Sequence, residues 1–195
     1  MKNTHKLYTD VIAKSGSKNE PLEVTANGTY EAPKGTGYSL VKVNVKLEGN
    51  PLQYVIDNNG GDGVPNCKYL FYYYNGTSLG KAIEGLDTSK VTDFSYMFSS
   101  CFNLTSVPQL DTSNGTDFSR MFSSCNKLTS IGIYGFSRSI DITPTALEHD
   151  AIVAFLNQAG TAYNSNQKIT MGSTKLELLS DEEKAIATNK GWTLA

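Results

Sequence analysis

The side chains that could perform acid–base chemistry in this chain are carboxylates that recur at a fixed interval. Asp87 recurs as Asp111, and Asp93 recurs at the same interval as Asp117. Two carboxylates held close together can act as a general acid and a general base. Here each pair is a residue and its copy in a repeated sequence, and no histidine lies in that sequence. We therefore expect structural roles for these aspartates and do not expect the protein to be an enzyme.

Three cysteines and two histidines are the side chains that could bind a metal. Cys101 and Cys125 occupy the same place in successive repeats, so they can form a disulfide, supply half of a metal site, or stack as small buried apolar side chains. Stacking is favoured because a disulfide needs a specific geometry and structural zinc needs about four close ligands. His5 and His149 lack metal-ligand spacing. We expect neither a metal nor a cofactor.

Two further patterns resemble ligand sites but are better explained by structure. Residues 58–63 are glycine-rich, yet they lack the Lys-Ser/Thr pair of a phosphate-binding loop and the pattern of an EF-hand. They are interpreted as a hinge or turn at a domain boundary. Glu148, His149 and Asp150 are consecutive, so on a helix they point in different directions and form a solvated face.

The strongest pattern in the chain is a sequence that occurs twice, and the structure that this repeat forms should position the candidate aspartates and cysteines. Residues 86–107 read LDTSKVTDFSYMFSSCFNLTSV, and residues 110–131 read LDTSNGTDFSRMFSSCNKLTSI. The period, from the start of one copy to the start of the next, indicates stacked repeats and lies in the range of leucine-rich repeats. Each unit begins with a predicted turn, followed by helical apolar spacing after Asp93 or Asp117 and then by a short extended segment. The expected repeat core consists of Phe94, Met97, Phe98, Cys101 and Leu104 with their copies Phe118, Met121, Phe122, Cys125 and Leu128.

Two clear units are fewer than the roughly three that stacked repeats need, so the flanks should supply degenerate units. Upstream, residues 70–71 align with residues 97–98. Downstream, residues 168–171 and 192–194 are predicted to add one strand each.

Tyr72, Tyr73 and Tyr74 form the most distinctive candidate binding surface. Exposed tyrosines favour recognition because they provide a large contact area at a low entropic cost. The favoured interpretation, however, is that these rings belong to a capping unit and cover the end of the stack.

The N-terminal part divides into a polar segment and a small β-module. Residues 1–20 carry an apolar stripe of helical spacing, a candidate site of particle attachment, and residues 14–19 are interpreted as a linker. The alternative is a loose terminus. In residues 21–57, apolar and polar residues alternate over 41–48, which predicts a strand with one buried face. The candidate attachment residues are Leu7, Tyr8, Val11 and Ile12.

The C-terminal part is predicted to be helical with short strands. Residues 144–159 should form a helix, with Pro144 in its first turn and Gly160 at its end. Ser180 and Glu183 match a capping box that opens a second helix.

Composition limits the function classes. The net charge of −2 argues against nucleic-acid binding, and charged residues make up 18% of the chain. The N-terminal sequence lacks the apolar segment of a secretory signal, and no run approaches the ~18 apolar residues of a membrane span. We expect synthesis and assembly in a cytoplasm and no membrane insertion.

The repeat also resembles a known family. Met-Phe-Ser-Ser-Cys followed by Leu-Thr-Ser resembles the leucine-rich repeat of BspA-like bacterial surface proteins over residues 65–133. Residues 21–47 and 171–194 resemble segments of bacteriophage tail and minor structural proteins. This resemblance implies an α+β fold in four parts. These are an N-terminal attachment segment and linker (1–20), an antiparallel β-module (21–57), a short leucine-rich-repeat solenoid (64–133) and an α/β C-terminal cap (134–195).

The resemblance also implies a function but transfers no functional residue. We expect a non-enzymatic bacteriophage virion protein, either a tail or baseplate accessory or a surface decoration, whose repeats bind a host glycan or protein. Its partners would be other virion proteins, with self-association left open. The alternative is a bacterial cell-surface leucine-rich-repeat adhesin. An enzyme that hydrolyses glycans would require two carboxylates outside the repeat register.

Overall fold

The computed structural model describes residues 3–6, 11–15, 18–21, 29–32, 38–43, 56, 65–79, 83 and 86–195. Its five N-terminal strands form two antiparallel sheets, one of order β1-β4 and one of order β3-β2-β5. The strands of residues 1–20 thus pair with strands from later in the chain. The bounds are β1 (Asn3–Lys6), β2 (Val11–Ser15), β3 (Lys18–Pro21), β4 (Thr29–Ala32) and β5 (Tyr38–Val43).

At the described residues of the apolar stripe, Val11 and Ile12, the structure has a strand where helical turns were predicted, so that prediction is wrong there. Val11 and Ile12 lie in strand β2, where their β-branched side chains are favoured. The predicted linker at 14–19 is also wrong, because Ser15 in β2 pairs with Lys18 in β3. Leu7 and Tyr8 lie outside the described residues, as does most of the alternating segment that follows Val43.

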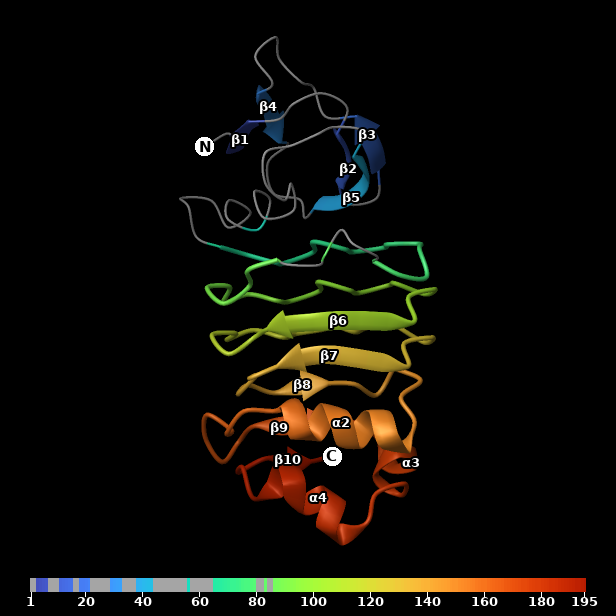
Figure 1. Ribbon diagram of the computed structural model, residues 1–195, viewed down its shortest axis with the longest axis vertical. Helices are drawn as coiled ribbons and strands as arrows, with labels where there is room; N and C mark the ends of the chain where they lie inside the picture. Colours follow the sequence, from blue (N-terminus) through green and yellow to red (C-terminus); the bar gives the residue numbers. More distant parts are fainter. Residues whose placement is uncertain are drawn as a thin grey trace.

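Over residues 66–79 and from residue 86 onward the chain runs in coils stacked one on the next (Figure 1). On one side of the stack, β6 (Ser106–Asp111) pairs in parallel with β7 (Ser130–Tyr134). Val107 lies opposite Ile131, but Leu110 lies opposite Ile133, so a bulge separates the two pairs. Gly132 lies at this bulge, where an added Cβ would come within 2.7 Å of the Pro108 backbone. Both strands begin near the predicted extended segments. Strand β6 also includes residues 110–111, which were expected to form a turn.

The other side of each coil is a series of overlapping turns and not the predicted helix. Within a coil, every second N–H bonds to the carbonyl three residues earlier, as in Met97 to Phe94 and Ser99 to Tyr96. The N–H groups in between bond to the next coil, as in Tyr96 to Ser119. A helix would use all these groups within one segment. The alternation instead joins the coils by a continuous hydrogen-bond ladder.

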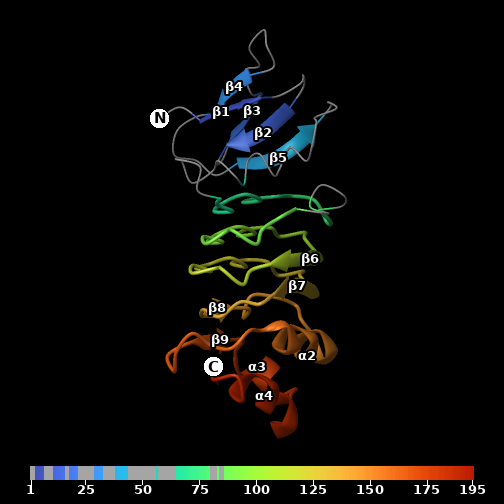
Figure 2. The same ribbon diagram turned by 60° about the vertical axis from the view of Figure 1, so that its left-hand side comes forward.

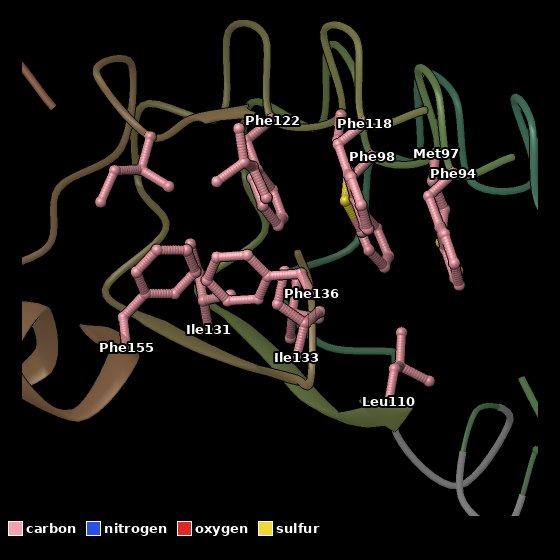
Figure 3. Packing of buried hydrophobic residues seen from close by; sticks show 14 of the residues in the cluster. Phe94, Met97, Phe98, Leu110, Phe118, Phe122, Ile131, Ile133, Phe136 and Phe155 are labelled. Carbon is pink, nitrogen blue, oxygen red and sulfur yellow. The ribbon is translucent and has the colours of Figure 1, made fainter. Parts of the chain in front are cut away.

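Phenylalanine rings stack between coils in the interior. Phe94 lies 5.4 Å from Phe118, and Phe98 lies 5.5 Å from Phe71 and 5.9 Å from Phe122. Figure 3 shows rings from the turn side meeting the aliphatic side chains of β6 and β7. Aromatic burial of this kind dominates core energetics. No more than 3% of any side chain's surface is exposed in the repeat core: Phe94, Met97, Phe98, Cys101, Leu104, Phe118, Met121, Phe122, Cys125 and Leu128.

Repeated polar side chains fasten the turns and the neighbouring coils. Asp87, Asp93, Asp111 and Asp117 each accept a hydrogen bond from the backbone N–H two residues later. These are local Asx turns, so no helix is capped by Asp93 or Asp117. The buried hydroxyl of Thr112 donates to the next coil, with 2.7 Å between its Oγ1 and the backbone carbonyl oxygen of Tyr134.

The C-terminal part continues one side of the stack and covers the other. Strands β8 (Ile140–Asp141), β9 (Lys168–Thr170) and β10 (Thr193–Leu194) form a parallel sheet of order β10-β9-β8. Two of these strands are the ones predicted at 168–171 and 192–194. Asp141 repeats the Asx turn of Asp93 and Asp117, with Thr143 as donor.

Helix α2 (His149–Gln158) closes the open edge of β7 (Figure 1, Figure 2). The Gln158 side-chain amide donates to the carbonyl oxygens of Ile131 at 3.1 Å and Ile133 at 2.8 Å. This removes unpaired acceptors from an edge strand. The helix begins later than predicted, because Pro144 lies in a turn in which the Thr145 N–H bonds to the Ile142 oxygen.

Two short helices complete the chain, α3 (Ser173–Leu176) and α4 (Asp181–Thr188). The capping box of Ser180 and Glu183 is confirmed at the start of α4. Gly191, with φ +85°, follows the helix in the left-handed conformation that glycine favours. Lys190 caps α2 by donating to three carbonyl groups near its C-terminal end.

Candidate recognition surface

The overlapping turns point two residues inward and the next two outward. In the first coil, Leu70 and Phe71 are buried, whereas Tyr72 is partly exposed and Tyr73 is exposed. We call the outward positions of three successive coils the tyrosine–serine face. All of them except Ser95 and Ser99 are at least partly exposed. The face has four tyrosines, four exposed or partly exposed serines, two buried serines (Ser95 and Ser99) and two cations but no carboxylate. Its positions are Lys68, Tyr69, Tyr72, Tyr73, Ser95, Tyr96, Ser99, Ser100, Ser119, Arg120, Ser123 and Ser124.

One column of this face is a stack of rings ended by cations. Tyr69 and Tyr96 stack with centroids 4.8 Å apart. The Arg120 guanidinium lies 5.7 Å from the Tyr96 centroid, and the Lys68 ammonium lies 5.7 Å from the Tyr69 centroid. Lys68 also lies 3.8 Å from an Asp93 carboxylate oxygen. Each cation thus lies within cation–π range of a ring, a contact of about 0.5–1 kcal/mol at an exposed site.

An exposed aromatic cluster lies on the same face. The Tyr73 ring centroid lies 4.5 Å from that of Tyr72, with the planes inclined by 84°, and 6.2 Å from that of Phe102, with the planes inclined by 64°. Tyr73 is 43% exposed and Phe102 is 48% exposed. Burial, followed by the neighbouring Tyr73, raises the pKa of Tyr72. The Tyr72 phenol therefore stays a neutral donor at physiological pH.

The three consecutive tyrosines do not act together. Tyr72 and Tyr73 contribute to the cluster, but Tyr74 packs at right angles to the buried ring of Phe71. Its hydroxyl donates to the Ser78 carbonyl oxygen at 2.7 Å. Tyr74 therefore closes the end of the first coil and is not part of the tyrosine–serine face.

Sequence reasoning missed Tyr69, Tyr96 and Phe102, which complete the surface. Tyr69 precedes Tyr96 by the same interval that separates the stacked Phe71 and Phe98. This interval was the available signal for the tyrosine stack. Phe102 has no counterpart of its type in the next repeat, where the residue is Asn126.

Backbone strain coincides with this face. Six non-glycine residues among those described adopt positive φ, and all belong to it: Tyr69, Tyr73, Tyr96, Ser100, Arg120 and Ser124, with φ between 55° and 63°. A side chain in this region costs of order 1 kcal/mol or more, and glycine avoids that cost. The positive φ recurs at serine, tyrosine and arginine alike, so it is a property of the repeated turn.

The cysteines form a buried column instead of a chemical site. Cys101 and Cys125 are free, and each thiol lies 3.1 Å from a carbonyl oxygen of the preceding coil. Burial raises the pKa of Cys101, and it raises that of Cys125 to about 12. Neither thiol is a nucleophile in the folded protein. Among the described residues, no group of three His, Cys, Asp or Glu side chains could hold a metal ion.

His149 joins two helices at the C-terminal end of the molecule. Its Nδ1 lies 2.8 Å from an Asp150 oxygen and its Nε2 lies 2.9 Å from a Glu183 oxygen. Hydrogen bonding to these carboxylates raises the pKa of His149. Glu148 and Asp150 are exposed, as the predicted solvated face requires, and His149 also links α2 to α4 through Glu183, as an ion pair when the imidazole is protonated.

Comparison with known proteins finds one family match, which lies in the coils. Residues 56–145 match the model of the family described as "Mycoplasma protein of unknown function, DUF285", which is related to the BspA-like repeat proteins. No curated protein and no solved structure matches the chain. None of the helices in the described part of the chain is long and apolar enough to cross a membrane.

Proposed function

We propose that the protein is a non-enzymatic structural component of a bacteriophage virion that presents a binding surface. In this proposal the coils from residue 66 onward form a leucine-rich-repeat solenoid, and the tyrosine–serine face binds a host molecule or another virion protein. The protein would be a tail or baseplate accessory or a surface decoration, assembled in the host cytoplasm.

The tyrosine–serine face is the observation that supports a binding role. Tyrosine and arginine are the residues on which protein interfaces rely most, and serine supplies adaptable hydrogen bonds. Stacked coils also present extended surfaces suited to binding. The assignment to a virion has a different support, namely the resemblance of residues 21–47 and 171–194 to phage structural segments.

The second candidate is a bacterial cell-surface adhesin. It is favoured by the family match over residues 56–145, because the related BspA-like proteins are bacterial surface proteins. The same face would then bind a host or neighbouring-cell molecule.

Immunogold electron microscopy with an antibody against residues 65–195 separates the two candidates. Label at a fixed place on purified virions would support the virion role, and its position would distinguish tail from capsid. Label on the surface of bacteria together with unlabelled particles would refute the virion role and support the adhesin.

A further inference from the structure

We infer that the tyrosine–serine face binds a polypeptide segment that combines an acidic side chain with an apolar one. The acidic group would pair with Arg120, and the apolar side chain would pack on Tyr72, Tyr73 and Phe102. This inference rests on the proposed binding function and adds to it the chemistry of the partner.

The Arg120 guanidinium is available to bind an anion. Its guanidinium is exposed, always charged and oriented by the Tyr96 ring. No ion pair forms between Arg120 and a carboxylate of the described residues, and none of the twelve positions of the face is acidic. An arginine fork that is held in place and lacks an acidic partner favours a carboxylate on the ligand.

The local charge of the face differs from that of the whole chain. The chain carries a net charge of −2, so it does not attract acidic peptides in general. The pairing must therefore come from Arg120, with Lys68 contributing less because Asp93 lies beside it.

The aromatic cluster supplies the apolar part of the site. Tyr73 and Phe102 are two of the most exposed large apolar side chains of the described residues, and their rings touch. Arg120 lies two coils from Tyr73, and adjacent coils joined by backbone hydrogen bonds lie ~5 Å apart. Because Tyr73 lies in the column beside that of Tyr69, Tyr96 and Arg120, the separation exceeds the ~10 Å rise of two coils. An acidic and an apolar side chain about four residues apart in one extended peptide can span it.

A polypeptide fits this surface better than a polysaccharide. Sugar rings bind on free aromatic faces, but Tyr69 and Tyr96 stack on each other and on the two cations. Tyr72 and Tyr73 also meet at a steep angle instead of forming a flat platform. The mixture of tyrosine, serine and arginine is that of antibody surfaces that bind proteins.

The test uses the full chain as bait for a displayed library of random dodecapeptides. We expect the selected peptides to be enriched in Asp or Glu together with aromatic or aliphatic residues. For the tightest peptide, Arg120→Ala and Tyr73→Ala should each weaken binding at least tenfold, and binding should weaken as salt rises.

Arg138→Ala is the matched control, because Arg138 also stacks on a tyrosine, Tyr163, but at the C-terminal end. It should leave the affinity unchanged. Arg120→Gly separates binding from folding, since glycine relieves the positive φ of this position while removing the guanidinium. This variant should lose binding while unfolding at the same or a higher temperature.

Selected peptides without acidic enrichment, or equal binding by the Arg120→Ala and Arg138→Ala variants, would overturn the inference. Binding to the acidic polysaccharide alginate without any peptide selection would also overturn it. Microscopy tests the location of the protein independently. Labelled virions with no acidic peptide selected would refute only the chemistry of the partner, and an unlabelled particle would refute only the virion role.

Discussion

Phe71 and Phe98, one coil apart, stack with ring centroids 5.5 Å apart and planes inclined by 1°. Phe98 also stacks on Phe122 and is fully buried, so its removal would leave a cavity between three coils. Phe98→Ala should lower the free energy of unfolding by about 3–5 kcal/mol. Chemical denaturation would measure this loss. Phe102→Ala is the control, because this exposed side chain should contribute less than about 0.5 kcal/mol; equal stabilities of the two variants would contradict the stacked core.

The left-handed turns can be tested at Ser100, which has a φ of +63°. Ser100→Gly should raise the free energy of unfolding by about 0.5–1 kcal/mol, and Ser100→Val should lower it by about 1–3 kcal/mol, because a β-branched side chain fits this region poorly. At Ser119, which lies outside the set of positive-φ residues, glycine should instead destabilise. Thermal melts of the three variants would show whether the signs differ as expected.

The buried thiols predict slow labelling of the native protein. Because burial raises the pKa of Cys125 to about 12, only about one thiol in 10⁴ is ionised at pH 8 while the native packing holds. Cys67 and Cys101 are equally buried. Reaction with a thiol reagent that produces a coloured product should be slow before unfolding and rapid for all three cysteines afterwards. Rapid native labelling of Cys101 and Cys125 would refute the stacked arrangement.

The His149 link predicts a pH-dependent contribution to stability. Its pKa is raised above 6.5 by Asp150 and Glu183, so its contribution is complete below about pH 6.5 and is lost as pH rises through the raised value. The pKa of Glu183 is lowered, mainly by the Ser180 N–H and then by His149. Its contribution is present above about pH 4.5 and is lost on acidification through the lowered value.

Denaturation of the wild type and of His149→Asn at several pH values would measure this link. Their stability difference should be largest between about pH 4.5 and 6.5 and should shrink towards pH 9. Lys184→Ala is a control, since its exposed pair with Asp181 does not involve the histidine. A stability difference that does not change from pH 5.5 to pH 9 would show that His149 does not act through its charge.

The repeat period predicts which residues meet, but not the backbone between them. Phe94 and Phe118 stack, and Cys125 contacts the coil of Phe98, because corresponding positions of successive coils are neighbours. The helical interpretation failed because two residues inward and two outward give apolar positions at intervals of three, one and three. A helix gives the same intervals over two turns. The two structures differ in their positive φ values and in the alternation of hydrogen bonds within and between coils, and serine or tyrosine at these positions does not signal either feature.

The surface was harder to predict than the core. Of the three tyrosines in the predicted candidate surface, Tyr72 is partly exposed and Tyr73 is exposed, whereas Tyr74 closes a coil, as the capping interpretation expects. The stack of Tyr69 on Tyr96 depends on an interval that is longer than the clear period of the two repeats. The coil that contains Asp141 was also missed. Its Asx turn keeps only the aspartate of the repeat, and the apolar residues that would reveal the repeat in the sequence have changed.

The hydrogen-bond ladder between the turns has a consequence for how such a chain can vary in length. Each coil offers the next one the same alternating set of N–H and carbonyl groups. A duplicated block of one full period, inserted between two coils, would find the same hydrogen-bonding groups on the coils above and below it. The N-terminal and C-terminal ends of the stack would not need to change. Gene duplication could thus extend the reach of this protein by ~5 Å per copy, adding two further outward pairs of side chains on which a new specificity could evolve.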